Sequence, residues 1–165
     1  MARDLTERLV ALGKAHELVR PALGEQKRAA PLADLLAVLL AAYDDKGTIG
    51  SRIHVAVPEI LVGEGAITAM ALVVHELATN SIKYGALSKE AGSLGVTCTA
   101  DDSEMVLVWT ERGGPRVSAP SEQTGFGSVL VKNTITRNLG GTIAFDWPPE
   151  GVIVTLRMNR ARLGT

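Results

Sequence analysis

The chain of 165 residues is long enough for one ordinary domain, and with 46% apolar but only 4% aromatic residues its core must consist of Leu, Val, Ile and Ala. The formal net charge of −1 gives no overall attraction for nucleic acid or an anionic membrane surface. The single cysteine, Cys98, excludes an internal disulfide and a thiolate metal cluster. Neither a signal-peptide pattern nor an apolar run long enough to span a bilayer occurs, so we expect a soluble cytoplasmic protein without membrane contact.

The beginning of the chain is typical of two helices. Apolar residues and one histidine recur there at alternating spacings of four and three: Leu5, Leu9, Leu12, His16, Val19 and Leu23. Such a narrow stripe packs one helix against another, either in a homodimeric bundle or against a second helix that Pro31 opens. We expect residues 1–46 to form a helical lead-in and residues 47–165 to form the main domain.

The periodicity changes to two at residue 53, where Ile53, Val55 and Val57 alternate with other residues, as in a half-buried strand. Helices are predicted over residues 66–86 and from just after Gly127 to Gly140. Further strands are predicted over residues 94–100, 104–110, 142–147 and 152–158. The order of these elements predicts an α+β fold in which a mainly antiparallel sheet carries helices on one face.

The predicted helix over residues 66–86 carries a polar face. At 100° per residue, Glu76, Asn80 and Lys83 lie within about 60° of one another, while the opposite side is apolar. The helix by itself allows two interpretations, a solvated edge of an amphipathic helix or a functional site.

A glycine-rich segment over residues 111–127 is the second candidate site. Gly113 and Gly114 directly follow a strand, and Gly125 and Gly127 flank Phe126 at a predicted helix N-terminus. Glycines at such places let backbone N–H groups approach a phosphate, whose charge the helix dipole favours. The alternative is a flexible surface loop. The segment matches neither the P-loop nor the dinucleotide-binding fingerprint.

The two candidate sites together suit one chemistry. Glu76 and Asn80 offer oxygen donors suited to Mg²⁺ and to activating a hydroxyl or imidazole group, and Lys83 can neutralise phosphate. Glu111 at a strand end can accept a hydrogen bond from an exocyclic amine. These side chains and a glycine-rich lid suit a nucleoside triphosphate.

Four segments of the chain resemble the HWE sensor histidine kinases. Residues 75–88, HELATNSIKYGALS, resemble the N-box of that family, and residues 109–115, WTERGGP, resemble its W-x-E G1 box. Residues 124–127, TGFG, resemble the G2 box, and residues 8–16, RLVALGKAH, resemble the segment after the phosphoacceptor helix. The resemblance covers nearly the whole chain.

The resemblance implies the GHKL (Bergerat) fold of gyrase, Hsp90, histidine kinases and MutL, a two-layer α/β sandwich with a mixed sheet backed by helices. It implies the ATP-binding kinase domain of a two-component sensor histidine kinase, which uses ATP and Mg²⁺. The partners implied are a phosphoacceptor histidine domain and the receiver domain of a response regulator. Alternatives from other classes are a non-catalytic docking module of the same fold and an anti-sigma type of serine kinase.

The resemblance also implies residue roles. Asn80 would coordinate Mg²⁺, Glu76 would be the polar catalytic residue, and Lys83 and Tyr84 would face the nucleotide. Other implied nucleotide-binding residues are His75, Glu111, Gly113, Gly114, Thr124, Gly125, Phe126 and Gly127. Glu111, where the wider superfamily usually has Asp, would lie nearest the adenine amine. His75 is open to two roles, a packed histidine or a neighbour of the nucleotide.

The phosphoacceptor of the family belongs to a helix that precedes residues 8–16, so we expect the acceptor histidine to lie outside this chain. His16 stands within the apolar stripe, so its expected role is packing, and the alternative is that His16 itself is the phosphoacceptor. We also expect Met1 to be the boundary of a piece of a longer protein.

Overall fold

The computed structural model describes residues 29–43, 52–116 and 126–164, together with residues 6, 9–10 and 13. The elements in chain order are β1 (Ala29–Pro31), α2 (Leu32–Ala41), β2 (Ile53–Ala56), β3 (Leu61–Gly63), α4 (Glu64–Lys83), η1 (Ala86–Ser88), β4 (Ser93–Ala100), β5 (Glu104–Arg112), α5 (Phe126–Asn138), β6 (Thr142–Asp146), β7 (Ile153–Asn159) and α6 (Arg160–Leu163). His16 and most of the predicted apolar stripe lie outside the described residues, but Leu9 of that stripe is described and is 60% exposed.

The main sheet has the strand order β2-β4-β5-β7-β6. Strand β2 pairs with β4 in parallel, whereas the other neighbouring strands pair antiparallel. A parallel pair needs a long crossover connection, and α4 forms most of it. The predicted mixed sheet is therefore confirmed.

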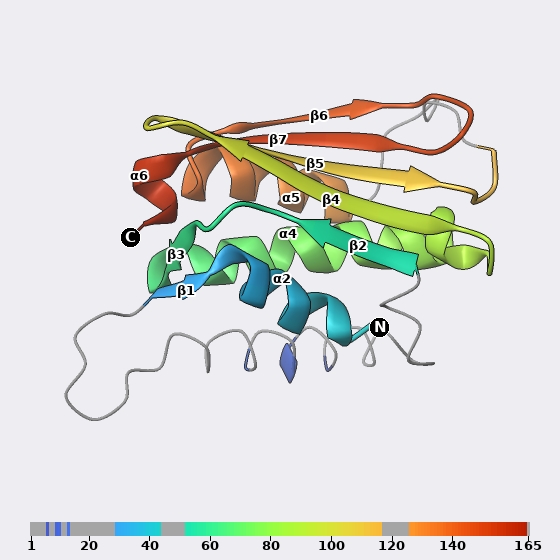
Figure 1. Ribbon diagram of the computed structural model, residues 1–165, viewed down its shortest axis with the longest axis horizontal. Helices are drawn as coiled ribbons and strands as arrows, with labels where there is room; N and C mark the ends of the chain where they lie inside the picture. The colour runs from blue at the N-terminus through green and yellow to red at the C-terminus, as the bar shows by residue number, and fades with distance from the viewer. Residues whose placement is uncertain are drawn as a thin grey trace.

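Alternation along the strands places the core on one face of this sheet. The buried apolar side chains of the neighbouring strands β5 and β7 are Met105, Leu107 and Trp109 on β5 and Val154, Leu156 and Met158 on β7. The register sets Trp109 opposite Val96 on one side and Val154 on the other. Figure 1 shows α4 and α5 beneath the same face of the sheet. The two-layer arrangement is therefore confirmed.

Helix α4 is the central element of the helical layer. Its apolar residues, among them Met70, Val73 and Leu77, are buried. The helix predicted over residues 66–86 is confirmed with shifted bounds. It ends at Lys83 because the next residue caps it through its backbone N–H, and Gly85 is extended at φ −110° and ψ −152°.

Helix α2 packs into the same core. Its side chains Leu35, Leu36 and Leu39 are at most 1% exposed and join one hydrophobic cluster with those of α4. Strands β1 and β3 pair antiparallel, and Leu32 N donates to Ile60 O at 2.7 Å. Sequence reasoning missed this pair because strands of three residues are too short for a readable alternation.

The closing elements follow the prediction except at the end. Helix α5 is confirmed and is followed by Gly140 at φ +60°, where Gly141 N donates to Ile135 O at 3.0 Å. The two closing strands are confirmed as β6 and β7. The short helix α6 was not predicted. Its N-cap is Asn159, whose side chain accepts from two backbone N–H groups.

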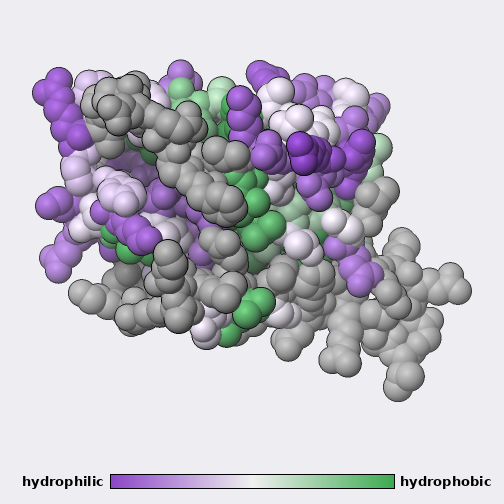
Figure 2. Space-filling model, turned by 180° about the vertical axis from the view of Figure 1, so that it is seen from behind, coloured by the Kyte–Doolittle hydropathy of each residue, from purple (hydrophilic) through white to green (hydrophobic). Residues whose placement is uncertain are grey.

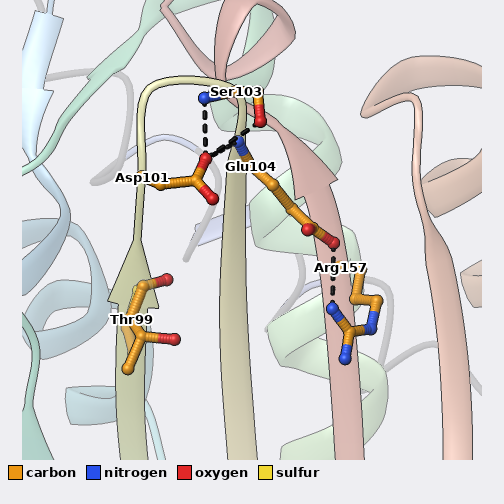
Figure 3. Close-up of polar contacts among 6 residues, drawn as sticks. Thr99, Asp101, Ser103, Glu104 and Arg157 are labelled. Atoms are coloured by element: carbon orange, nitrogen blue, oxygen red, sulfur yellow. Dashed lines mark hydrogen bonds and ion pairs between the residues drawn. The ribbon is translucent and has the colours of Figure 1, made fainter.

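The β4–β5 hairpin turns around Asp101 (Figure 3). Asp101 Oδ1 accepts from Ser103 N at 2.8 Å, Glu104 N at 2.8 Å and Ser103 Oγ at 2.9 Å. These hydrogen bonds, led by that of the Ser103 backbone, lower the pKa of Asp101. Beside the turn, Arg157 and Glu104 form an exposed ion pair at 3.1 Å, which contributes little to stability.

The surface seen from behind has hydrophilic residues on both sides of a narrower band of hydrophobic residues (Figure 2). Among the described residues, the large apolar side chains that are exposed include Leu61 at 53% and Tyr84 at 73%. Within the described part of the chain, no helix combines the length and apolar character needed to cross a membrane.

Candidate functional site

The last two turns of α4 carry the polar face that the sequence singled out. Glu76 is only 8% exposed, whereas Asn80 and Lys83 are exposed. The polar face therefore runs from a buried carboxylate to an amide and an ammonium group in solvent. A simple solvated edge does not account for Glu76, because carboxylates are rarely buried without a role or a partner. A ligand at this end of α4 can reach Asn80 and Lys83 without displacing core side chains.

The segment after α4 continues this exposed polar surface. Tyr84, which directly follows the helix, is the most exposed of the described large hydrophobic residues at 73%. The chain then turns inward, because Gly85 and Ala86 are buried. Tyr84 is therefore available to a ligand, while the two residues after it are fixed against the sheet.

Arg52 holds the same segment from the side of β2. Its guanidinium donates to Gly92 O at 3.0 Å, to Ala86 O at 3.5 Å and to the carbonyl oxygen of Lys89. The guanidinium group has several N–H donors and can bind several carbonyl oxygens at once. This one side chain therefore holds both ends of the segment from Ala86 to Gly92. Sequence reasoning did not single out Arg52, whose acceptors are backbone atoms more than 30 residues away and leave no pattern in the sequence.

Glu111 holds the segment from the side of β5. The residue is 4% exposed, and its Oε1 accepts from Ser81 Oγ at 3.0 Å and from Ala86 N at 2.9 Å. Its Oε2 accepts from Trp109 Nε1 at 2.9 Å. The tryptophan and glutamate of the W-x-E motif thus bind each other and, through Ser81, the last turn of α4. Contact of Glu111 with an adenine amine stays a prediction.

The glycines after β5 permit a close approach between two backbone segments. A Cβ added at Gly114 would lie 2.5 Å from Ala86 Cα, and one at Gly113 would lie 2.7 Å from Ala91 O. Gly113 also has φ +77°, a conformation that favours glycine. Gly113 is exposed and Gly114 is half-buried, but each is fitted closely against the segment after α4. The choice between a surface loop and a phosphate-binding loop stays a prediction.

His75 is a buried, hydrogen-bonded side chain at 3% exposure. Its Nδ1 is paired with the hydroxyl of Tyr43 at the end of α2, and its Nε2 lies 3.5 Å from Thr79 Oγ1. The rings of Tyr43 and His75 have centroids 5.7 Å apart. The packed role that the sequence left open is confirmed, and proximity to a nucleotide stays a prediction. Sequence reasoning did not single out Tyr43.

The remaining predicted site residues are those of the predicted glycine-rich lid. Thr124 and Gly125 lie outside the described residues, and Phe126 and Gly127 form the start of α5. Helix α5 packs against α4 and runs back along it, so its first residues lie toward the end at which α4 finishes (Figure 1). The lid role of these four residues stays a prediction.

Comparison with known proteins assigns a family to this site. No family model matches the chain. Blue-light-activated histidine kinase 1 of Erythrobacter litoralis is 35% identical over 153 residues, which are 92% of this chain and 41% of that protein. The blue-light-activated histidine kinase of Brucella ovis is 31% identical over 156 residues, 92% of this chain and 31% of that protein. The chain therefore spans less than half the length of these relatives.

Solved structures agree with the fold. The histidine kinase domain of the blue-light activated histidine kinase EL346 from Erythrobacter litoralis matches with a TM-score of 0.74 at 17% identity, over 97% of this chain and 78% of that chain. The catalytic domain of histidine kinase ThkA matches with a TM-score of 0.65 at 15% identity, over 80% of this chain and 95% of that chain. These structures confirm the fold, whereas the resemblance to histidine kinases read from the N-box and W-x-E motifs is confirmed by the relatives at 35% and 31% identity.

Proposed function

We propose that this chain, a member of the histidine kinase family by sequence and fold, is a catalytic domain that binds Mg·ATP and transfers the γ-phosphate to a histidine outside it. The observation that carries the proposal is the end of α4, where Asn80, Lys83 and Tyr84 are exposed beside the buried Glu76. Phosphoryl transfer depends mainly on positioning and charge neutralisation, and this helix end offers both.

Each exposed residue has a task in this proposal. Lys83 neutralises phosphate charge, and Tyr84 contacts the nucleotide. Glu76, one turn before Asn80, orients and polarises the acceptor imidazole as the polar catalytic residue. Its burial at 8% exposure supports this role, because a carboxylate with restricted solvent access interacts more strongly with a nearby polar group.

The donor set fits a magnesium ion. Asn80 presents an amide oxygen to solvent, and among the described residues no group of three or more His, Cys, Asp and Glu side chains could hold a metal. Mg²⁺ usually keeps several waters and takes one or two protein ligands besides substrate phosphates, so a single exposed asparagine suffices. We propose that Asn80 holds the ion, which when bound supplies positive charge to the phosphates.

The other nucleotide-binding residues surround this helix end. We assign Glu111 to the adenine side of the site and Gly113 and Gly114 to its floor, where they pack against the segment after α4. His75 is buried within α4 beside Glu76, where its hydrogen bonds help to hold the helix that carries the site. The lid consists of Thr124, Gly125, Phe126 and Gly127.

The partners follow from the proposed transfer. The histidine kinase ThkA was solved in complex with the response regulator protein TrrA, and that structure matches this chain with a TM-score of 0.63 at 14% identity. We propose that residues 1–46 are a helical lead-in derived from dimerisation and phosphoacceptor helices, whose α2 packs into the common core, and that residues 47–165 are the ATP-binding domain. Leu9 at 60% and Val10 at 49% exposure are available for a helical homodimer.

Calorimetric titration with Mg·ADP tests the binding step. We expect a saturable heat for the wild type and no detectable binding for Asn80→Ala. Asn138→Ala is the matched control, because Asn138 is an exposed asparagine at the far end of α5. Absence of heat with the folded wild type would contradict the proposal and indicate a docking module.

Transfer from labelled ATP to a protein carrying a phosphoacceptor helix tests the kinase step. We expect the label to be lost in mild acid, as for phosphohistidine. An acid-stable label would indicate a serine kinase instead. Binding of ATP without any transfer would refute the kinase proposal.

A further inference from the structure

The Glu111 carboxylate connects the sheet to the end of α4. Two of its three donors, Ser81 Oγ and Ala86 N, belong to the last turn of α4 and to the segment after it, and the third is the indole of Trp109 on β5 itself. A carboxylate has about four acceptor positions, so most of its capacity is used within the protein. All three donors are buried with it.

From these contacts we infer that Glu111 is a positioning residue, which fixes the last turn of α4 to β5 and so holds Asn80 and Lys83 where the nucleotide binds. The inference rests on the proposed function and concerns how Glu111 acts there. Ser81 lies between Asn80 and Lys83 in the sequence, so anchoring its hydroxyl restrains the rotation of the helix that presents both. This anchoring is a second task of the carboxylate, in addition to its place on the adenine side of the site under the proposed function.

Glycine at position 85 leaves the space that the carboxylate of Glu111 occupies. A Cβ added at Gly85 would lie 2.1 Å from Glu111 Oε1, 3.1 Å from Ser81 Cα and 3.2 Å from Glu111 Cδ, so the carboxylate is the nearest obstacle. Any residue can adopt the φ of −110° found at Gly85. Glycine is therefore required at this position because there is no space for a side chain, and not because of the backbone conformation. An aspartate at position 111 is one methylene shorter and withdraws its oxygens from this space, at the cost of the two contacts to the α4 end.

Two nucleotides separate positioning from adenine selection. Mg·ADP has the exocyclic amine and Mg·IDP has a carbonyl oxygen in its place. We expect Glu111→Gln to weaken the binding of Mg·IDP by a factor of about ten and that of Mg·ADP at least as much, because one carboxamide cannot accept from all three donors. The loss for Mg·IDP measures positioning, because this nucleotide has no exocyclic amine. A variant that loses affinity for ADP alone overturns the inference.

Ser81→Ala provides the same test with a milder change. It removes one donor of Glu111 and leaves the carboxylate present, so we expect weaker binding of both nucleotides and shifted backbone amide NMR signals of Asn80 and Lys83. Unchanged affinity and unchanged signals in this variant overturn the inference. If the wild type binds neither nucleotide, the proposed function fails, while the stability test below still decides whether Glu111 positions α4.

A double-mutant cycle tests the match between positions 85 and 111. We expect Gly85→Ala to lower the melting temperature strongly and Glu111→Asp to lower it moderately. The double variant melts above Gly85→Ala, because the shorter acid makes room for the added methyl group. Gly95→Ala is the control, since a Cβ there meets no atom within 4 Å. Additive losses in the double variant overturn the match.

Discussion

Ser81→Ala measures how strongly the end of α4 is held. Ser81 is 1% exposed, and its Oγ donates to Glu111 Oε1 at 3.0 Å and accepts from Leu87 N at 3.2 Å. The substitution removes one oxygen and opens no large cavity, so its cost comes from these two hydrogen bonds. The bond to the carboxylate contributes about 1.5–3 kcal/mol and the backbone bond about 0.5–1.5 kcal/mol. We expect the free energy of unfolding to fall by about 3 kcal/mol.

Urea unfolding followed by tryptophan fluorescence measures this loss. For a chain of this size a loss of about 3 kcal/mol corresponds to a melting temperature lower by about 6–12 °C. Ser88→Ala is the control in the same segment, because Ser88 is exposed and its Oγ donates to Gly85 O at 2.6 Å. We expect it to cost less than about 1 kcal/mol. Equal losses for the two variants at an unchanged m-value would refute the reasoning.

Three further predictions concern other parts of the fold. If α2 belongs to the core, Leu39→Ala should lower the free energy of unfolding by about 2–5 kcal/mol. Leu61 is 53% exposed, so Leu61→Ala should lower it far less, and the midpoints of urea unfolding compare the two variants. Burial raises the pKa of Cys98 to about 11. At pH 8 its thiol should therefore react with Ellman's reagent about a hundredfold more slowly than a thiol of pKa about 9. Unfolding in urea should abolish this difference in rate. The hydrogen bonds at Asp101 lower its pKa, so their contribution to stability is complete above the unfolded pKa of about 4 and is lost as pH falls through the folded pKa. The stability difference between wild type and Asp101→Asn should shrink over that range, and a constant difference would contradict the assignment.

Most of the regular elements could be predicted from local patterns. The apolar spacing and high helix propensity of α4, the alternation in β5 and β7, and the glycines after α5 each act within a few residues. Elements that lack such a pattern escaped prediction. Strands β1 and β3 are too short to show alternation, and α6 is a single turn held by its Asn159 cap.

The residues of the candidate site were singled out from the sequence and their roles stay predictions, whereas their contacts within the fold could not be predicted. The N-box spacing placed Glu76, Asn80 and Lys83 on one helix face, and the structure agrees. The same spacing gave no sign that Glu76 is buried while the other two are exposed. Burial depends on what packs against the helix, and those neighbours come from distant parts of the chain.

The sequence by itself therefore determined α4, the strands of the main sheet and the resemblance to histidine kinases, and it singled out the residues of the candidate site, because propensity, periodicity and motif spacing are local properties. Only the tertiary structure decided that Glu111 binds Ser81 across 30 residues, that Tyr43 pairs with His75, and that Gly113 fits against the segment after α4. These contacts depend on strand order and packing distance, which no single stretch of sequence encodes. They fix the end of α4, and the proposed nucleotide site depends on it.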